Sequence, residues 1–409
     1  MYKSIDACRI CGNDKLEIVL ELGEQTLTGV FPKDTHTPIT TGPLTLVKCI
    51  GENNCGLLQL AHSYPLEEMY GENYGYRSGL NPTMVAHLKL QVEKIKVLGI
   101  IEKEDIIVDI GSNDATTLKQ YGLDNCTLVG IDPTANKFRQ FYTSNIELIA
   151  DFFSSDAYMQ KYGRRKAKVV TSFSMFYDLE DPLAFMHEVT NILDSNGIWI
   201  FEQSYMPLML STNSYDTICH EHLEYYSLSQ IMWMAERVGL KIVDVEQNDV
   251  NGGSFSVTAQ KVNGKLNVSH AVQEMVASEK VQRLDDLQTY FDFADRALES
   301  KRTLLKFFKD AKLAGKTVAA LGASTKGNVI LQYCRIDSSM IQSIGEVNPD
   351  KFGAYTPGTH IPIINEVEML ASKPDYVLVL PWHFRKYFES ERRYAGLKFV
   401  YPLSAQSLD

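Results

Sequence analysis

Short apolar runs that stop at a glycine or an acid alternate with helical patterns through the middle of the chain. The β-branched run 106–110 ends at Gly111, which is followed by small polar residues. A second apolar run, 128–131, ends in Asp132. Strand, glycine loop, helix, strand and acid form the nucleotide-binding βαβ pattern of a doubly wound sheet, in which the acid accepts hydrogen bonds from ribose hydroxyls.

The glycine loop favours a cofactor that has no phosphate groups at this point. It is not GxGxxG, because Gly111 stands alone before Ser112 and Asn113, and a pyrophosphate needs several close approaches of the backbone. S-adenosylmethionine (SAM), which carries an adenosine and an amino-acid tail, fits this loop better. A nicotinamide cofactor and a βαβ core without a ligand are the alternatives.

Further apolar runs extend the predicted sheet, at 146–149, 168–173, 197–202 and 251–257. Asp151 and Phe152 follow the first of these runs, where the amino group and ring face of adenine are usually met. The loop 174–182 follows the second run and contains Ser174 and Tyr177. Because ligands of such sheets bind at the carboxyl ends of the strands, we expect this loop to face the reacting centre.

Four of the seven cysteines lie near the amino terminus, where they predict a metal site. Cys8 and Cys11 are two residues apart and precede a glycine, as in one half of a zinc knuckle, and Cys49 and Cys55 form the other half with a longer gap. Two such turns close a tetrahedral site of four thiolates, and metal binding folds a segment too small to be stable alone. We therefore predict a structural zinc ion; four unpaired cysteines are the alternative.

An aromatic stretch separates the cysteines from the glycine loop. Met69–Gly79 contains Tyr74 and Tyr76 together with an arginine and three glycines. We interpret this stretch as a lid over cofactor and substrate, with a packed aromatic hairpin as the alternative. A helical pattern begins after Pro82 and leads into the first strand.

The densest run of acid–base groups lies between residues 215 and 227. It includes His220, Glu221 and His222, which lack the i,i+4 histidine pair that a zinc-binding HExxH helix supplies. We favour a proton-transfer cluster in which one imidazole is the base and a carboxylate fixes its tautomer, over a solvated polar turn. The two histidines should point the same way in an extended loop and diverge in a helical turn.

A second strand–loop–helix unit begins at Lys316, after a long helical region from about residue 262 to 314. Its loop offers backbone N–H groups, hydroxyls and an ammonium at a helix start, which suits a phosphate, although the P-loop spacing is absent. A packing turn is the alternative. Two later loops, 348–363 and 380–384, also follow predicted strands. The candidate substrate contacts are Ser324, Thr325, Lys326, Gly327, Asn328, Lys351, His360 and Trp382.

The length, composition and charge of the chain indicate its broad class. The chain has 409 residues, 44% of them hydrophobic, and a formal net charge of −11. These values predict a globular protein of two or three domains, which the strand–loop–helix patterns make α/β, and argue against broad binding to nucleic acid or anionic membranes. No apolar leader and no membrane-length apolar stretch is visible, so we expect a soluble, cytoplasmic protein. We also expect a monomer.

Taken together, eight motifs resemble those of the C3-methyltransferases of nucleotide-linked 4-keto-6-deoxy sugars, typified by the enzymes of the tetronitrose and mycarose pathways. In chain order they are CRICG with CIGENNC, YGYRSG, VDIGSND, SMFYDLEDP, CHEHLEYYSL, NGGSF, LGASTKGN and PGTHIPI. The resemblance spans the whole chain. It implies an N-terminal zinc-binding domain (1–68), a central Rossmann-like SAM methyltransferase domain (69–262) and a smaller C-terminal α/β domain that holds the nucleotide of a nucleotide-diphosphate sugar (263–409).

The resemblance also implies roles for single residues. His222 is the base with Glu221 beside it, Tyr74 and Tyr76 reach the active site from the lid, and the SAM site includes Asp109, Gly111, Asp132 and Asp151. Cys219 and Tyr177 depart from the pattern of the tetronitrose enzyme, which places the exact sugar and ring position in question. An O- or N-methyltransferase acting on a small metabolite and a non-catalytic zinc-ribbon binding protein are the alternatives.

Overall fold

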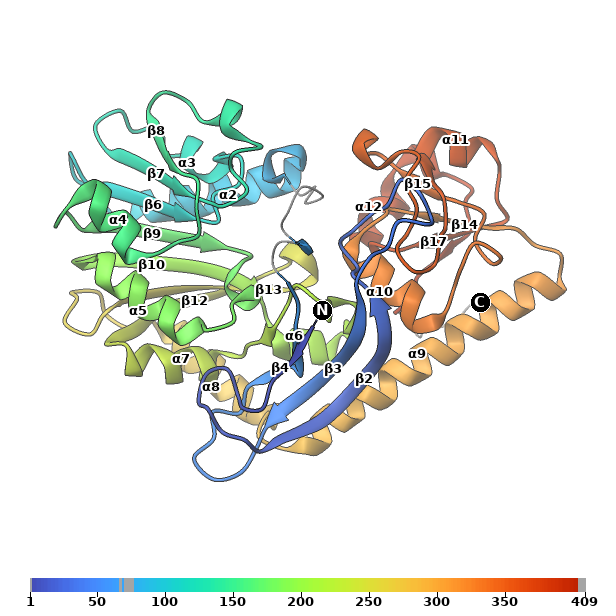
Figure 1. Cartoon of the computed structure of the whole chain (residues 1–409), viewed down its shortest axis with the longest axis horizontal. Helices are drawn as coiled ribbons and strands as arrows, with labels where there is room; N and C mark the ends of the chain where they lie inside the picture. The colour runs from blue at the N-terminus through green and yellow to red at the C-terminus, as the bar shows by residue number, and fades with distance from the viewer. Residues whose placement is uncertain (1, 66–67, 70–76, 404–409) are drawn as a thin grey trace.

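The chain forms two α/β lobes that are joined by a strand-rich N-terminal segment and a long helix (Figure 1). The computed structural model describes residues 2–65, 68–69 and 77–403. The central lobe holds a seven-stranded sheet, the C-terminal lobe a five-stranded sheet, and the N-terminal strands a four-stranded sheet. This arrangement confirms the predicted order of a zinc-binding segment, a Rossmann-like domain and a smaller α/β domain.

The central sheet is doubly wound, with strand order β12-β13-β10-β9-β6-β7-β8. The strands from β8 to β10 run parallel, and β13 pairs antiparallel with both β10 and β12. All five residues of β6 are buried, as its unbroken apolar pattern predicts. The strands are β6 (Ile106–Ile110), β7 (Thr127–Ile131), β8 (Ile146–Ile149), β9 (Ala167–Phe173), β10 (Leu193–Ser204), β12 (Leu240–Asn248) and β13 (Ser254–Lys261).

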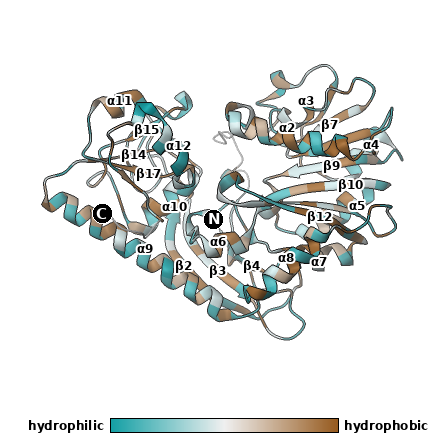
Figure 2. Ribbon diagram, turned by 180° about the vertical axis from the view of Figure 1, so that it is seen from behind, coloured by the Kyte–Doolittle hydropathy of each residue, from teal (hydrophilic) through white to brown (hydrophobic). Residues whose placement is uncertain are grey.

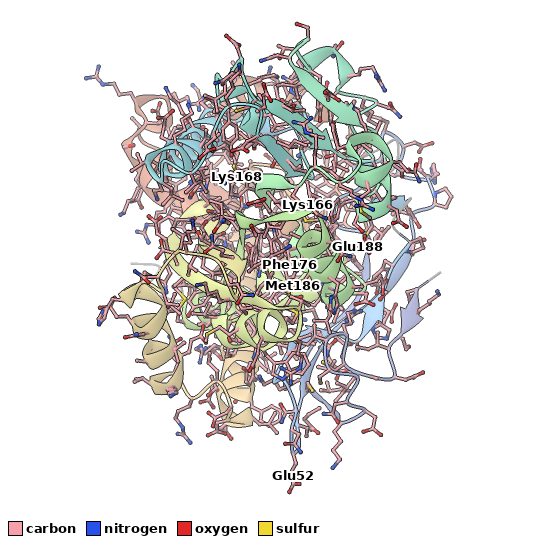
Figure 3. All side chains as sticks on the ribbon, turned by 90° about the vertical axis from the view of Figure 1, so that its left-hand side faces the viewer. Glu52, Lys166, Lys168, Phe176, Met186 and Glu188 are labelled. Atoms are coloured by element: carbon pink, nitrogen blue, oxygen red, sulfur yellow. The ribbon has the colours of Figure 1, made fainter. Side chains whose placement is uncertain are left out.

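Helices cover both faces of this sheet, and several begin where the sequence supplies a cap. Asn81 accepts hydrogen bonds from the backbone N–H groups of Thr83 and Met84 ahead of α2, in which Pro82 takes the first position. Phe176 and Met186 lie inside the lobe and are fully buried (Figure 3). The helices are α2 (Pro82–Val97), α3 (Thr116–Lys119), α4 (Ser155–Tyr162), α5 (Pro182–Ile192), α6 (Met206–Ser211), α7 (Leu228–Arg237) and α8 (His270–Val281).

The N-terminal sheet is completed by a strand from the central part of the chain. Its order is β11-β4-β3-β2, all antiparallel, with β2 (Leu16–Thr26), β3 (Thr41–Cys49), β4 (Leu58–Leu60) and β11 (Glu224–Tyr225). A two-stranded sheet pairs β1 (Lys3–Ser4) with β5 (His62–Ser63). The acid–base cluster therefore lies where the N-terminal sheet meets the central lobe.

The C-terminal lobe is a parallel sheet of order β16-β15-β14-β17-β18. The strands are β14 (Val318–Leu321), β15 (Ile344–Glu346), β16 (Ile363–Asn365), β17 (Tyr376–Val379) and β18 (Phe399–Val400). The helices are α10 (Thr325–Cys334), α11 (Glu366–Ala371) and α12 (Arg385–Ser390). This is the second strand–loop–helix unit that the sequence predicts.

The predicted helical connection is a pair, α8 and the 27-residue α9 (Leu287–Leu313). Apolar and polar residues alternate along α9 (Figure 2), which buries Leu304 and Phe307 in the core that the N-terminal and C-terminal segments share. In contrast, α8 buries Val272 and Met275 in the central lobe. The domain boundary at residue 262 stays a prediction. Although α8 follows this residue in the chain, it packs against the central lobe.

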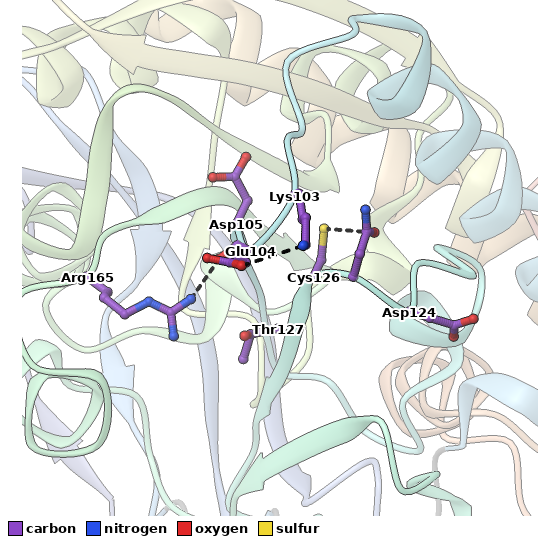
Figure 4. Close-up of a pocket in the computed structure, with 8 residues that line it drawn as sticks. Lys103, Glu104, Asp105, Asp124, Cys126, Thr127 and Arg165 are labelled. Carbon is purple, nitrogen blue, oxygen red and sulfur yellow. Dashed lines mark hydrogen bonds and ion pairs between the residues drawn. The ribbon is translucent and has the colours of Figure 1, made fainter.

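A shallow polar pocket of about 710 Å³ lies at the edge of the central sheet opposite the glycine loop (Figure 4). It is lined by residues that precede or begin β6 and β7, among them Asp105 and Thr127, together with Arg165. Ligands of doubly wound sheets bind at the other edge, so this pocket is not part of the candidate active site.

Candidate active site

Gly111 and Asp132 lie side by side at the carboxyl ends of β6 and β7. Gly111 turns the chain with a φ of +73°, a conformation that favours glycine. The Asp132 carboxylate accepts hydrogen bonds from the backbone N–H of Asn113 at 2.8 Å and of Thr134 at 2.7 Å. Loop and acid are thus held together, and the contact of Asp132 with the ribose of an adenosine stays a prediction.

Asp109 and Ser112, which are predicted to contact the cofactor, make hydrogen bonds to other side chains around this loop. The Asp109 side chain is buried, and its Oδ1 accepts a hydrogen bond of 2.5 Å from the Thr171 hydroxyl. Burial raises the pKa of Asp109 to about 7. The Ser112 hydroxyl lies 2.8 Å from the Tyr142 hydroxyl, which donates to the carbonyl of Asn113 at 2.9 Å. A direct contact of Asp109 or Ser112 with the cofactor stays a prediction.

The predicted adenine position is open. Asp151 and Phe152 follow β8, and the Phe152 side chain is 56% exposed. The Asp151 carboxylate accepts the Phe152 backbone N–H at 2.7 Å and is otherwise exposed. An exposed ring face beside an exposed acid has the chemistry to stack on adenine and accept from its amino group.

The four N-terminal cysteines converge on one point. Their sulfur atoms all lie within 4.8 Å of one another, with Cys8 and Cys55 3.4 Å apart and Cys11 and Cys49 3.5 Å apart. A tetrahedral zinc ion with bonds of about 2.3 Å holds its sulfurs about 3.8 Å apart, so the residues fit zinc. Glu52, in the loop between the last two cysteines, lies at the lower end of the molecule in Figure 3, whereas Phe176 lies near its centre.

His222 is held by the backbone in one tautomer. Its Nδ1 lies 2.9 Å from the carbonyl oxygen of Thr217, which can only accept, so Nδ1 donates and the lone pair of the neutral ring is on Nε2. The ring centroid lies 4.2 Å from that of Tyr177. Burial, with a smaller contribution from the charge of Lys326, lowers the pKa of His222 to about 4.

His220 turns away from His222, into the N-terminal sheet. Its side chain is fully buried, its ring meets that of Tyr64 edge-on at 4.6 Å, and its Nδ1 lies 3.5 Å from the Thr28 hydroxyl. Burial lowers the pKa of His220 to about 4. The backbone N–H of His222 donates to the Cys219 carbonyl at 3.1 Å, so the segment is a turn and the two histidines diverge, as expected for a turn.

The Glu221 carboxyl lies between the N-terminal segment and α10. A Cβ atom on Gly29 would meet Glu221 Oε1 at 2.2 Å and the Thr325 hydroxyl at 3.6 Å, so this contact requires glycine. Burial raises the pKa of Glu221, which favours its neutral, hydrogen-bond-donating form. The Tyr177 backbone carbonyl accepts the N–H of Leu223 at 2.8 Å, which ties the loop after β9 to the turn that carries Glu221.

Lys326 reaches from α10 to the central lobe. Its ammonium donates to the carbonyl of Asn251, whose amide lies 3.4 Å from the Ser174 hydroxyl. The buried Asp216 attracts this ammonium, and Asp216 accepts a hydrogen bond of 2.9 Å from the Trp382 indole. Burial lowers the pKa of Lys326 and raises the pKa of Asp216. Lys326, Trp382 and Ser174 are thus brought together at one domain contact.

The other predicted substrate residues are spread over the C-terminal lobe. The Ser324 hydroxyl caps α10 by accepting the Gly327 N–H at 3.1 Å, and the Asn328 amide donates to the Thr28 carbonyl at 2.7 Å. The Lys351 ammonium donates to the Ala323 carbonyl at 2.8 Å. His360 is exposed and has a φ of +54°, and Tyr74 and Tyr76 lie outside the described residues.

Three family models match the chain in order and between them cover most of it. A zinc binding domain model matches residues 8–70, a methyltransferase domain model matches 86–245, and a C-methyltransferase C-terminal domain model matches 249–404. The C-methyltransferase NovU of Streptomyces niveus is 29% identical over 98% of this chain and 96% of its own. These matches show that the chain is a C-methyltransferase. This C-methyltransferase uses SAM, and its four cysteines hold a structural zinc ion.

Similar solved structures cover about half of this C-methyltransferase. An O-methyltransferase family protein from Burkholderia thailandensis is 15% identical, with a TM-score of 0.38 over 49% of this chain and 64% of its own. Magnesium protoporphyrin IX methyltransferase from Synechocystis is 11% identical, with a TM-score of 0.33 over 43% of this chain and 79% of its own.

Asp216 and Asn251 also belong to the site, although neither is among the residues predicted from the sequence. Asp216 stands just before the histidine cluster, and its partner Trp382 is 166 residues away. Asn251 bonds Ser174 and Lys326 from the turn between β12 and β13. The Asn-Gly-Gly sequence at 251–253 was a signal for this turn, because all three residues have positive φ.

Proposed function

We propose that this C-methyltransferase transfers the methyl group of SAM to C3 of a nucleotide-linked 4-keto-6-deoxy sugar. The observation that carries the proposal is the tautomer of His222, whose Nδ1 is bound by the Thr217 carbonyl. The lone pair on Nε2 is then available to remove a proton. A ketone at C4 makes the C3 proton acidic, because the resulting carbanion is delocalised as an enolate.

The reaction divides into roles for single residues. His222 Nε2 takes the C3 proton, and the electron pair left on C3 attacks the sulfonium methyl that SAM supplies. Glu221 and Tyr177, with Tyr76 from the predicted lid, are polar groups for the developing enolate oxygen. His220 takes a minor part, because its ring is packed against Tyr64.

The C-terminal lobe would hold the nucleotide of the substrate. Its loop after β14 repeats the geometry of the SAM loop: the Ala323 N–H donates to the Glu346 carboxylate at 2.9 Å, as the Asn113 N–H does to Asp132. Such a loop beside an acid suits a nucleoside. In this proposal the residues of the α10 start and of the two later loops contact the nucleotide diphosphate and the sugar; they are Ser324, Thr325, Lys326, Gly327, Asn328, Lys351, His360 and Trp382.

The direct test is a panel of dTDP-, GDP- and CDP-linked 4-keto-6-deoxy sugars incubated with the protein and SAM. We expect S-adenosylhomocysteine to form with at least one of them, and carbon NMR of the product to show a new methyl on C3. The same nucleotides linked to sugars without the ketone are the control and should give no turnover. Methylation at an oxygen or nitrogen, or turnover without a ketone, would contradict the proposal.

A further inference from the structure

The zinc knuckle is joined to the His222 segment by strand pairing. β4 begins three residues after Cys55 and pairs with β11, with Gln59 opposite Glu224. The backbone N–H of Leu60 donates to the carbonyl of Leu223 at 2.8 Å. Leu223 follows His222 directly, so the backbone that carries the imidazole is bonded to the strand that leaves the zinc site.

Arg9 adds a second link from inside the knuckle. It lies between Cys8 and Cys11, and its guanidinium donates to the carbonyl of Leu60 at 2.6 Å. Its Nε lies 3.7 Å from Glu224 Oε1, and the two side chains are 3% and 0% exposed. Neither carboxylate oxygen of Glu224 has a hydrogen-bond donor within the described part of the chain. Arg9 is therefore the charge partner of Glu224.

A third set of contacts reaches the other loop beside His222. Arg9 donates to the Ser63 hydroxyl at 2.8 Å, and this hydroxyl donates to the Glu180 carboxylate at 2.9 Å. Glu180 lies in the same loop as Tyr177, whose ring packs on His222. The Gln230 amide of α7 also donates to the Cys55 carbonyl at 3.0 Å. Both segments that meet at His222 are thus bonded to the zinc knuckle.

We propose that Arg9 is a positioning residue for catalysis, through which the zinc-bound knuckle sets the location of His222. The metal fixes the backbone on each side of Arg9, and the guanidinium transmits that position to Glu224 and to the loop of Tyr177. A displacement of a catalytic group by about 1 Å can lower the rate about 100-fold. The inference rests on the proposed function only in taking His222 as the base.

The test compares Arg9→Met, Arg9→Lys and the double variant Arg9→Met with Glu224→Gln, with Arg302→Met on the exposed face of α9 as the matched control. We expect Arg9→Met to keep its zinc and to bind SAM normally by calorimetry while kcat falls about 10- to 100-fold. Arg9→Lys should recover part of the rate, because it restores a cation beside Glu224. The His222 imidazole signals in a proton–nitrogen NMR spectrum should move in Arg9→Met and stay in place in the control.

The double variant distinguishes a loss of positioning of His222 from the destabilisation that an unpaired, buried Glu224 carboxylate would cause. It leaves no unpaired carboxylate, so it should fold with normal zinc content, yet kcat should remain low because the bonds of Arg9 to Leu60 and Ser63 are gone. Wild-type kcat in the double variant, or unmoved His222 signals in Arg9→Met, would overturn the proposal. If the wild type turns over no 4-keto sugar nucleotide, the proposed function fails while the NMR comparison still decides the role of Arg9.

Discussion

His222 and Thr217 are joined by a hydrogen bond of 2.9 Å between the imidazole Nδ1 and a main-chain carbonyl oxygen. A carbonyl cannot donate, so this bond selects one tautomer of the neutral ring and leaves the lone pair on Nε2. The group that accepts this hydrogen bond is a main-chain carbonyl, whereas the sequence pattern predicts a side-chain carboxylate. Glu221, the adjacent acid, lies against Gly29 and Thr325 instead.

The first prediction concerns the pH dependence of the rate. Burial lowers the pKa of His222 to about 4, whereas a free imidazole titrates near 6.5. The base is active when neutral, so kcat should stay constant from pH 8 down to about pH 5 and fall only as the pH approaches 4. Stopped assays at saturating substrate would measure this profile. An acid limb near pH 6.5 would show that His222 is not buried in this way.

The second prediction concerns zinc. Cys8→Ser or Cys55→Ser removes one thiolate from a site whose metal binding contributes folding free energy. Both variants should give less soluble protein with less bound zinc by metal analysis, whereas Cys126→Ser, which changes a cysteine outside the zinc site, should behave as the wild type. Soluble, fully active and metal-free Cys8→Ser protein would contradict the structural role.

The fold could be predicted because each strand and helix is encoded by a local sequence pattern. Much of the site could not be predicted, because its contacts join residues that are far apart in the sequence. The runs that became β6 to β10 carry their own apolar patterns, and the cysteines carry their own spacing. In contrast, Lys326 is predicted to lie at a phosphate, and no sequence pattern indicates that its ammonium reaches the carbonyl of Asn251. The divergence of His220 and His222 likewise depends on Tyr64 and Thr217, which no periodicity connects to them.

The third prediction concerns the cofactor. Asp132→Ala removes the acceptor for the Asn113 and Thr134 N–H groups as well as the expected ribose contact. SAM affinity measured by calorimetry should fall, and binding of the free nucleotide should not change. Asp109→Ala should also weaken SAM binding, since Asp109 lies buried beneath the same loop. Unchanged SAM affinity in both variants would contradict the placement of the cofactor.

The fourth prediction concerns Lys326. Lys326→Ala should raise the KM for the sugar nucleotide more than the Kd for SAM, because one charge-assisted contact to an anion contributes about 1.5–3 kcal/mol. Lys306→Ala is the matched control, since this lysine is exposed on α9 and pairs with Asp310. Equal effects on both ligands, or none, would indicate that the loop after β14 is a packing turn.

Exchange of the C3 proton with deuterated solvent tests the central claim most directly. The 4-keto sugar nucleotide is incubated with the enzyme and S-adenosylhomocysteine, so that no methyl group can transfer, and loss of the C3 proton signal is followed by NMR. His222→Asn should slow this exchange about 10²- to 10⁴-fold, as expected for removal of a general base, with near-normal SAM binding, and His220→Asn should slow it less. Exchange that persists in His222→Asn and disappears in Glu221→Gln or Tyr177→Phe would contradict the account.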